Sequence, residues 1–533
     1  MKISNISTTF ITLLLTFSCL SVKAQLIPDN TLGKENSIIN SSVDKDLIEG
    51  GAIRDNNLFH SFKEFNVNLN QKIYFSNPDS ITNILTRVTG SNASKIFGTL
   101  GVDGGANLFL INPKGIVFGK NAKLDISGSF SATTAESIFI DNYEFSAVNP
   151  NDTPLLKINL TPGLQYGKIN PESEIENRGI LKVGEKQNLT LFGGRGNHRY
   201  SACLIAPGGV VELSGDDINL KGNVDTSGVD GNVGTLLIDP KNILIAENGD
   251  FSGNDISQAL AVNNVILQAN NDITVDDDIT GIGTNNLTLE AGRSVNIGEN
   301  RNKFLIGGSF KAKINDENAL PSERDAGIAT FGMNPQSSII TIGTGTFTQQ
   351  SSGNINLSAR QLIAKGGAQV LTTTFDAGKA GNLNINVSDS IDLIDPSEQG
   401  ITSGLFATSF KNASGDGGNI NVKTGDFNIV DRAAVSVSGE GVGNAGDIDI
   451  EAIKLFLDIS SIAARSVSGE GGDINLTIAD LLLLRNNSTI STRAGTETSG
   501  GGNGGNITFN GGFVVAVPSE NSDINANAFQ GNG

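Results

Sequence analysis

Residues with the chemistry of catalysis or tight metal binding are few and scattered in this chain. Its two histidines, His60 and His198, lie far apart in sequence with different neighbours, so we predict neither a metal pair nor a histidine-based catalytic triad. Cys203 stands between alanine and leucine without an identifiable base, which favours a buried small apolar residue over a nucleophile. We therefore expect no catalytic residue, no metal site, no cofactor and no enzymatic activity.

Acidic clusters are the remaining candidates for chemistry. Asp216 with Asp217, and Asp276 with Asp277 and Asp278, could hold Ca²⁺ together with backbone oxygens. Some parallel β-helix proteins also use carboxylates to bind or cut polysaccharides. Solvated turns explain both clusters equally well, and no Gly-Gly-x-Gly-x-Asp calcium repeat is present. A polysaccharide-directed enzyme or binding protein is the alternative hypothesis. The scarcity of aromatic residues other than Phe, with 4 Tyr and no Trp, argues against it, because Tyr and Trp rings commonly stack on sugars.

Short strands must position these residues, because apolar and polar residues alternate in many short stretches. Examples are residues 189–192, 210–213, 273–275 and 295–297. Clusters of Gly, Asn and Asp separate the stretches, and most of the chain has no sustained helical period. Residues 80–88 could form a helix capped by Ser80, or a strand. The pattern predicts an all-β protein.

A repeat in the C-terminal half predicts how the strands stack. A small residue, a glycine, a polar residue and an alternating strand recur roughly every 26 to 37 residues. Each copy is too small to bury its own apolar face, so neighbouring copies must stack around one long core, as in a parallel β-helix. The polar positions Asn354, Asn382, Asn419 and Asn506 should then form hydrogen-bonded ladders with a structural role.

The N-terminus predicts export. Lys2, an apolar run at residues 10–17 and Val-Lys-Ala before Gln25 have the layout of a secretory signal peptide cleaved after Ala24. No later stretch has about 18 uninterrupted apolar residues, so we expect no transmembrane segment after cleavage. Cys203 would be the one cysteine of the mature chain, which allows no internal disulfide.

The charge of the chain restricts its partners. The formal net charge is −19 at pH 7, which makes nucleic acid an unsuitable partner. With 65 Gly, 26 Phe and 17% charged residues, the composition is that of neither a helical protein nor a disordered acidic one. Glycine-rich turns between apolar strands fit it better.

One turn is more informative than the rest. Residues 107–119 read as a strand, an Asn-Pro-Lys-Gly turn and a second strand. In this turn Pro113 fixes φ, Asn112 can bond the backbone beyond it, and Gly115 can adopt the positive φ that other residues resist.

This turn and its surroundings resemble the N-terminal secretion domain of filamentous-haemagglutinin-like exoproteins of two-partner secretion (TPS) systems. The family has Asn-Pro-Asn-Gly-Ile where this chain has Asn112 to Ile116, with Lys114 in place of the second Asn. The resemblance is strong over about residues 26–165 and looser to the end of the chain. Asn77 and Pro78 alone match the family's second motif, Asn-Pro-Asn-Leu. The other similar stretches are residues 60–67, 84–90, 94–100, 124–135, 206–213 and 236–240.

The resemblance implies a right-handed parallel β-helix with an N-terminal cap. It divides the chain into a signal peptide at residues 1–24, a TPS or filamentous haemagglutinin N-terminal domain at 25–245 and β-solenoid repeats at 246–533. The last repeat stops where another unit would begin, which leaves open a truncated chain or a last coil without a polar cap.

The resemblance also implies an export route and a role. A POTRA-bearing outer-membrane β-barrel would recognise the chain in the periplasm, and Asn112, Pro113, Gly115 and Ile116 would form the folding and transporter-recognition motif. The expected product is a secreted or surface-exposed, adhesin-like exoprotein, found outside the cell or at its surface. Its ligand would be a host cell, another surface or a polysaccharide.

Overall fold

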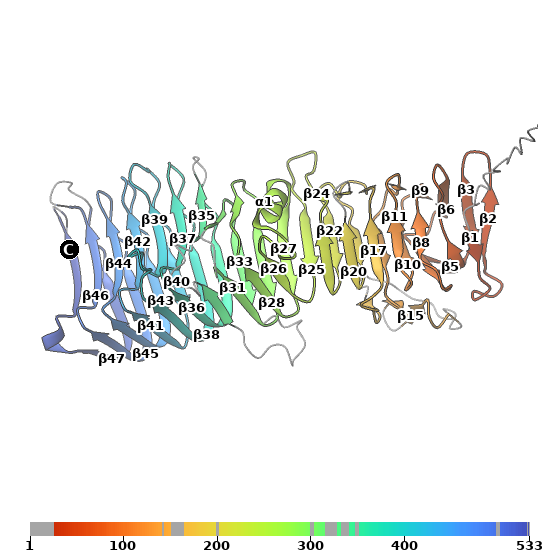
Figure 1. Ribbon diagram of the computed structural model, residues 1–533. Helices are drawn as coiled ribbons and strands as arrows, with labels where there is room; N and C mark the ends of the chain where they lie inside the picture. The colour runs from red at the N-terminus through yellow and green to blue at the C-terminus, as the bar shows by residue number, and fades with distance from the viewer. Residues whose placement is uncertain are drawn as a thin grey trace, which may run out of the picture.

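The protein is an elongated solenoid whose coils follow one another in chain order along its long axis (Figure 1). The computed structural model describes residues 26–140, 143–150, 165–198, 202–298, 303–314, 328–331, 341–346, 351–496, 502–529 and 531. The predicted signal peptide at residues 1–24 lies outside them. Most strands pair in parallel with the strand one coil away, which confirms the expected parallel β-helix.

A sheet of 23 strands runs the length of the solenoid. Its strands are β1 (Leu26–Pro28), β4 (Ala52–Arg54), β5 (Asn57–Phe65), β7 (Asn83–Val88), β10 (Asn107–Ile111), β13 (Phe130–Thr133), β19 (Leu189–Phe192), β22 (Val210–Ser214), β25 (Thr235–Asp239), β26 (Ile243–Ile245), β27 (Asn264–Ala269), β28 (Asp272–Val275), β30 (Leu287–Ala291), β31 (Ser294–Ile297), β33 (Phe310–Ile314), β34 (Ile328–Phe331), β36 (Ile355–Lys365), β38 (Leu383–Ile394), β40 (Ile420–Lys423), β41 (Asp426–Val430), β43 (Ile448–Asp458), β45 (Ile474–Arg485) and β47 (Ile507–Ala516).

Four shorter sheets complete the coils. Two lie in the N-terminal part: β2 (Ser37–Ser41), β3 (Asp46–Gly50), β6 (Lys72–Ser76), β9 (Thr99–Asp103) and β12 (Lys123–Asp125); and β8 (Ser94–Ile96), β11 (Ile116–Phe118), β17 (Glu174–Asn177), β20 (Arg195–His198) and β23 (Asp217–Leu220). A third has β18 (Ile180–Lys182), β21 (Cys203–Ile205) and β24 (Asn223–Asp225). The fourth has β29 (Ile279–Gly281), β32 (Lys303–Ile306), β35 (Thr341–Thr346), β37 (Gln369–Thr374), β39 (Gly404–Ser409), β42 (Ala434–Gly439), β44 (Ser461–Ser466), β46 (Thr489–Ala494) and β48 (Asp523–Ala528).

The core is a set of in-register apolar stacks. One stack takes one residue from each successive coil of the long sheet, and every member from Leu58 to Ile474 is buried. A single copy of the repeat buries little apolar area, so each coil depends on its neighbours for stability. The members are Leu58, Ile84, Leu108, Phe130, Leu189, Val211, Leu236, Val265, Leu287, Phe310, Ile355, Leu383, Ile420, Ile448, Ile474 and Ile507.

Antiparallel strands cover the N-terminal end of the solenoid. Strand β1 pairs antiparallel with β5, β2 with β3, and β4 with β5, whereas the coils beyond them pair in parallel. Such a cover occupies the hydrogen-bonding groups and the apolar face that the first coil would otherwise leave open. The expected N-terminal cap is therefore present.

A small antiparallel sheet packs on the outside of the first coils (Figure 1). It consists of β14 (Ser137–Ile140), β15 (Tyr143–Ser146) and β16 (Gln165–Tyr166). Phe145 and Ile138 join Phe59, Leu85 and Ile111, which point away from the main core, in a second apolar cluster. Strands β5, β7 and β10 are thus covered on both faces.

Residues 80–88 contain a strand, and the helix of the described chain lies elsewhere. Asn83–Val88 form β7, so the strand alternative holds for that segment. Helix α1 (Gly253–Val262) begins with a capping box between Ser252 and Asp255 and buries Ile256 and Leu260. A 3₁₀ turn, η2 (Pro518–Glu520), follows β47. Among the described residues, neither helical segment has the length and hydropathy to cross a membrane.

Candidate functional site

The Asn-Pro-Lys-Gly turn joins β10 to β11 through an internally bonded backbone. The Gly115 N–H donates to the Asn112 carbonyl oxygen at 3.0 Å, and the Lys114 N–H donates to Asn112 Oδ1 at 2.9 Å. Gly115 has φ of 109°, in the region that favours glycine. These are the contacts that the residue types predict.

This turn also ties three coils together. Asn112 is fully buried, and its Nδ2 donates to the carbonyl oxygen of Asn92 at 3.1 Å and to Ser94 Oγ at 3.0 Å in the preceding coil. On the other side, a Cβ added at Gly115 would lie 3.0 Å from the carbonyl oxygen of Glu174 in the following coil. The turn is therefore a tight junction, at which a side chain on residue 115 would force the following coil to shift.

The predicted motif residues lie together, but solvent reaches little of them. Asn112, Pro113, Gly115 and Ile116 are all buried, and Lys114 is the exposed residue of the turn. A protein partner can contact Lys114 directly, whereas the four buried residues can act on such a partner through the shape of the turn.

Asn77, the partial match to the family's second motif, has a similar structural role. Its Nδ2 donates to the carbonyl oxygen of Ile81 at 3.0 Å, and its Oδ1 accepts from the Ala106 N–H at 2.7 Å. The side chain therefore fastens the turn between β6 and β7 to the next coil.

Arg87 is the centre of a buried polar cluster that the sequence analysis missed. Its Nε donates to Ser61 Oγ at 3.0 Å, and its Nη2 donates to Thr31 Oγ1 at 2.9 Å. Its Nη1 and Nη2 also donate to the carbonyl oxygens of Ser146 at 2.8 Å and Pro150 at 2.7 Å. One guanidinium thus joins the cap, β7 and the segment that follows β15.

Asp29 provides the negative charge of this cluster through hydroxyl groups. Ser61 and Thr31 accept from Arg87 and donate to the Asp29 carboxylate at 2.8 and 2.6 Å, and Thr89 donates to it at 2.6 Å. Burial raises the pKa of Asp29, but hydrogen bonds from Thr31, Thr89 and Ser61 outweigh it and hold the pKa below its usual value. One signal in the sequence could have indicated this cluster. Leu85 is an apolar residue on the outward face of β7, and an apolar residue there predicts that another segment covers that face.

The two histidines and the cysteine lie on strands of three different sheets. His60 is buried in β5, where Nδ1 lies 3.0 Å from Ser37 Oγ, and burial lowers its pKa to about 3. His198 lies in β20 of a different sheet. Cys203 in β21 is half-buried, and its pKa is raised by burial and by the charge of Asp225, which disfavours the thiolate.

The acidic clusters lie in turns and at the start of a strand. Asp216 and Asp217 are exposed at the start of β23. Asp277 accepts from the Gly253 N–H at 2.9 Å and thereby caps α1, and its other oxygen accepts from the Asp278 N–H at 2.8 Å. Within the part of the chain that the structure describes, no group of three or more His, Cys, Asp or Glu could hold a metal ion.

Comparison with known proteins shows likeness to a family model, to a curated protein and to solved structures, of which one is given below. The family model described as TPS secretion domain matches residues 24–286. A curated heme/hemopexin-binding protein of Haemophilus influenzae is 35% identical over 69 residues, which are 13% of this chain and only 7% of that protein. The solved HMW1 secretion domain of Haemophilus influenzae is 16% identical, with a TM-score of 0.25 over 92% of this chain and 96% of that one. Because that score is low, the fold rests on the strand pairing described above.

Proposed function

Because residues 24–286 match the TPS secretion domain, the chain is an exoprotein of two-partner secretion, and we propose that it leaves the periplasm through a POTRA-bearing outer-membrane β-barrel. Outside the cell or at its surface it acts as an adhesin-like binding protein without catalytic activity. The Asn112 junction is the observation that carries this proposal, because it places the motif of the secretion domain where three of the first coils meet.

Coil-by-coil folding provides a physical basis for export. Each coil that forms outside the cell buries its inward residues against the coil before it, as Ile84 and Leu108 do in β7 and β10. This burial opposes return of the chain through the pore. A poorly formed turn at Asn112 would weaken the first coils, on which the later coils stack.

We assign the four buried motif residues to folding and Lys114 to direct contact with the transporter. The assignment follows from their exposure, since Asn112, Pro113, Gly115 and Ile116 are buried and Lys114 is exposed. Both functions are required for export, so both kinds of substitution reduce it, through different steps.

We also propose that the secretion domain ends near residue 245, before the end of the family match at residue 286. The three-stranded sheet ends at β24, the nine-stranded sheet begins at β29, and α1 contacts both strands. The helix thus lies where the three-stranded sheet gives way to the nine-stranded sheet, shortly after the proposed end of the domain.

A secretion assay tests the export proposal. The chain is expressed with and without its candidate transporter, as wild type, as the double variant Asn112→Ala with Gly115→Ala, and as Lys114→Glu. We expect transporter-dependent release of the wild type and periplasmic accumulation or degradation of the double variant. Lys114→Glu should keep the wild-type thermal stability when purified and still be released poorly. Normal release of the double variant would contradict the proposed role of the motif.

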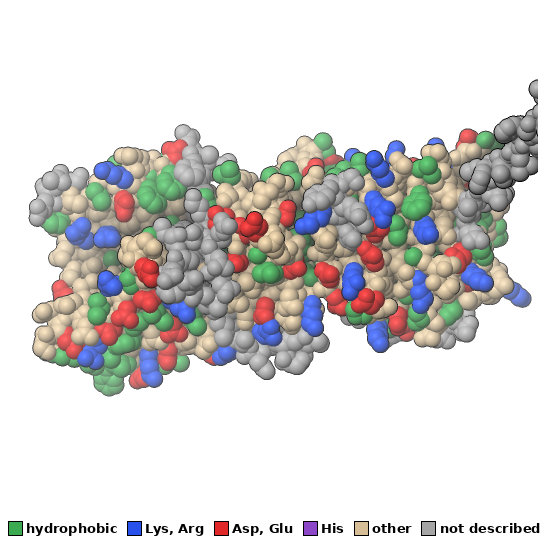
Figure 2. Space-filling model, in the orientation of Figure 1, with side chains coloured by type: hydrophobic (Ala, Val, Ile, Leu, Met, Phe, Trp, Pro, Cys, Tyr) green, Lys and Arg blue, Asp and Glu red, His purple; other side chains and the backbone are tan. Residues whose placement is uncertain are grey.

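The positions of the acidic residues favour a binding role over cleavage of polysaccharides. Asp277 is occupied by the N-terminus of α1, and Asp216 and Asp217 are exposed at the start of a strand. On the face that Figure 2 presents, acidic and basic side chains are interspersed. Incubation of the secreted protein with neutral and acidic polysaccharides, followed by sizing of the products, tests this point, and any shortening would contradict it.

A further inference from the structure

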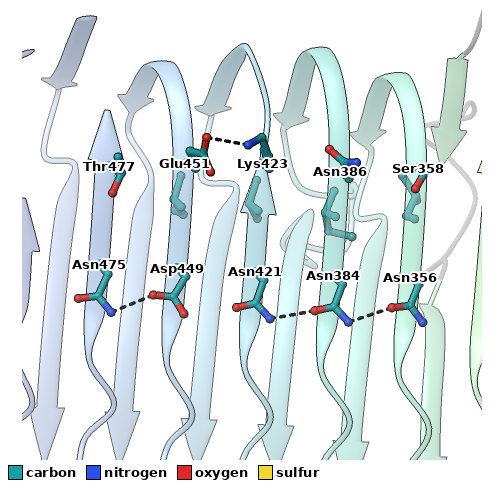
Figure 3. Close-up of a pocket in the computed structure, with 14 residues that line it drawn as sticks. Asn356, Ser358, Asn384, Asn386, Asn421, Lys423, Asp449, Glu451, Asn475 and Thr477 are labelled. Carbon is teal, nitrogen blue, oxygen red and sulfur yellow. Dashed lines mark hydrogen bonds and ion pairs between the residues drawn. The ribbon is translucent and has the colours of Figure 1, made fainter. Parts of the chain in front are cut away.

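A polar groove lies on the outer side of the long sheet in the C-terminal half (Figure 3). It has a volume of about 520 Å³ and is lined by β36, β38, β40, β43 and β45. The longer strands shift register at Ala359 to Gln361, Ala452 to Lys454 and Ile478 to Leu481, and such irregularities bend strands. The groove lies on the strand segments that precede these shifts. It runs across the strands, parallel to the solenoid axis.

A row of four amides and one carboxylate, here called the amide row, forms one side of this groove, and Ser358, Asn386, Lys423, Glu451 and Thr477 form a second row beside it (Figure 3). The members of the amide row, Asn356, Asn384, Asn421, Asp449 and Asn475, are in register on successive coils. Asn384 Nδ2 donates to Asn356 Oδ1 at 2.9 Å, Asn421 Nδ2 to Asn384 Oδ1 at 2.8 Å, and Asn475 Nδ2 to Asp449 Oδ1 at 2.8 Å (Figure 3).

The amide row leaves hydrogen-bonding capacity on the groove side. A side-chain amide has two N–H donors and an oxygen with two lone pairs, and a ladder contact on each side uses one donor and one lone pair. Asn384, in the middle of the row, therefore retains a donor and an acceptor, whichever way its amide is turned. The row repeats polar groups at the strand spacing of about 4.8 Å, with the Asp449 carboxylate, which only accepts, between the amides of Asn421 and Asn475.

The charge of the groove disfavours an anionic ligand. Its charged residues are Lys423, Asp449 and Glu451, which sum to −1, and Lys423 Nζ bonds Glu451 Oε1 at 2.8 Å. The lining includes no aromatic side chain, so binding would depend on hydrogen bonds and not on ring stacking. A peptide is also a poor fit, because added strands bind at sheet edges, and this groove lies on a sheet face.

We propose that this groove binds a neutral, linear polysaccharide that lies along the solenoid axis. Hydroxyl groups both donate and accept, so they match the free donors and acceptors of the amide row. The inference rests on the proposed binding role of the exoprotein, and it names the ligand class and the residues. Binding is measured on purified protein, so a failure of export and a failure of binding are distinguishable.

Titration calorimetry with uncharged hexasaccharides tests the proposal. The full chain is titrated with cellohexaose, maltohexaose and mannohexaose, and with a hexamer of galacturonic acid as the anionic comparison. We expect at least one neutral hexamer to bind more tightly than the anionic one. Absence of binding by all three neutral hexamers, or tighter binding of the anionic one, would overturn the inference.

Variants then test the amide row itself. The double variant Asn384→Ala with Asn421→Ala should weaken binding of the neutral hexamer by about tenfold or more, since several hydrogen bonds are lost. The matched control is Asn428→Ala on β41, which loses one bond to Asp392 at 2.7 Å but does not line the groove. Asn386→Met fills the groove without removing a ladder bond and should also weaken binding. Unchanged affinity in both groove variants would overturn the inference.

Discussion

The guanidinium of Arg87 in β7 donates a 2.8 Å hydrogen bond to the carbonyl oxygen of Ser146 in β15, 59 residues further along the chain. The same guanidinium lies 4.6 Å from the ring centroid of Phe145, which packs in the apolar cluster between the small sheet and the solenoid. One side chain therefore combines polar and apolar attachment of the small sheet. Arg87 therefore fastens β15 to the solenoid, and its role was not predicted from the sequence.

Replacement of Arg87 by alanine should destabilise the N-terminal coils. The change removes the positive charge that faces Asp29 through Ser61 and Thr31 and leaves buried acceptors unpaired, at a cost of about 3 to 5 kcal/mol. Urea unfolding of the purified chain measures this loss. Limited proteolysis should also cut β15 sooner than in the wild type.

Arg54→Ala is the matched control for Arg87→Ala. Arg54 pairs with Glu35 at 2.8 Å, but Glu35 is largely exposed, so we expect a loss of about 1 kcal/mol or less. Equal losses in the two variants would contradict the assignment of Arg87 as the attachment of the small sheet.

The turn at Asn112 should show a clear difference between its buried and exposed residues. Asn112→Ala leaves the Asn92 carbonyl and the Lys114 N–H without their side-chain partner and should cost about 2 to 4 kcal/mol. Gly115→Ala forces a Cβ onto positive φ near the Glu174 carbonyl and should cost about 1 to 3 kcal/mol. Lys114→Ala should stay within about 0.5 kcal/mol of the wild type. Thermal and urea unfolding of the three variants gives this order, and a loss at Lys114 equal to that at Asn112 would refute it.

Acid should destabilise the cap through His60. In the unfolded chain His60 takes up a proton near its ordinary pKa of 6.5, but in the fold burial lowers its pKa to about 3. The unfolded state therefore binds more protons between these values, and the free energy of unfolding falls as the pH drops through this window. Between pH 7 and about 4.5 the contribution of His60 should be a loss of roughly 2 to 3 kcal/mol.

Urea unfolding at both pH values measures this contribution. His60→Gln should remove that part of the pH dependence, whereas His198→Gln leaves His60 in place and should keep it. A pH profile that is the same in His60→Gln and the wild type would show that His60 is not the group responsible.

The repeat could be read from the sequence because its cause is local. Each Gly-polar-strand unit shows its own turn and its own alternation, so a parallel β-helix follows from stacking the units. Long-range contacts are less accessible: Arg87 bonds main-chain oxygens of Ser146 and Pro150, and carbonyl groups carry no sequence signal. The groove requires the exact register of Asn356, Asn384 and Asn421, which variable turns between copies conceal.

Helix α1 could have been predicted and was not. Ser252 and Asp255 form a capping box of the kind that marks a helix start, but only Ile256 and Leu260 lie on its buried apolar stripe. Two large buried apolar positions in a ten-residue helix give a weak helical period against a background of alternating strands. The capping residues were therefore the better signal.

The turn ladder was expected from the asparagine repeat, and the structure shows how it bonds. The side-chain oxygen of each member accepts from the backbone N–H of the next: Asn354 from Asn382 at 2.8 Å, Asn382 from Asn419 at 2.9 Å, and Asn419 from Asp447 at 3.0 Å. Each of these ladder bonds uses the side-chain oxygen as acceptor, and none of them uses the amide nitrogen. Asp447 continues the series by accepting from Asp473 at 2.8 Å, so a carboxylate serves as well as an amide.

Substitution at Asn419 should therefore depend on the oxygen and not on the amide nitrogen. Asn419→Ala leaves the Asp447 N–H without its acceptor and should cost about 1 to 2 kcal/mol in urea unfolding. Asn419→Asp keeps an acceptor at the same position, so we expect most of the wild-type stability at pH 7. Repulsion between the new carboxylate and Asp447 should lower the stability of Asn419→Asp somewhat. High salt screens this repulsion and should bring the stability of Asn419→Asp closer to that of the wild type. If Asn419→Asp loses as much as Asn419→Ala in high salt, the ladder does not depend on the side-chain oxygen.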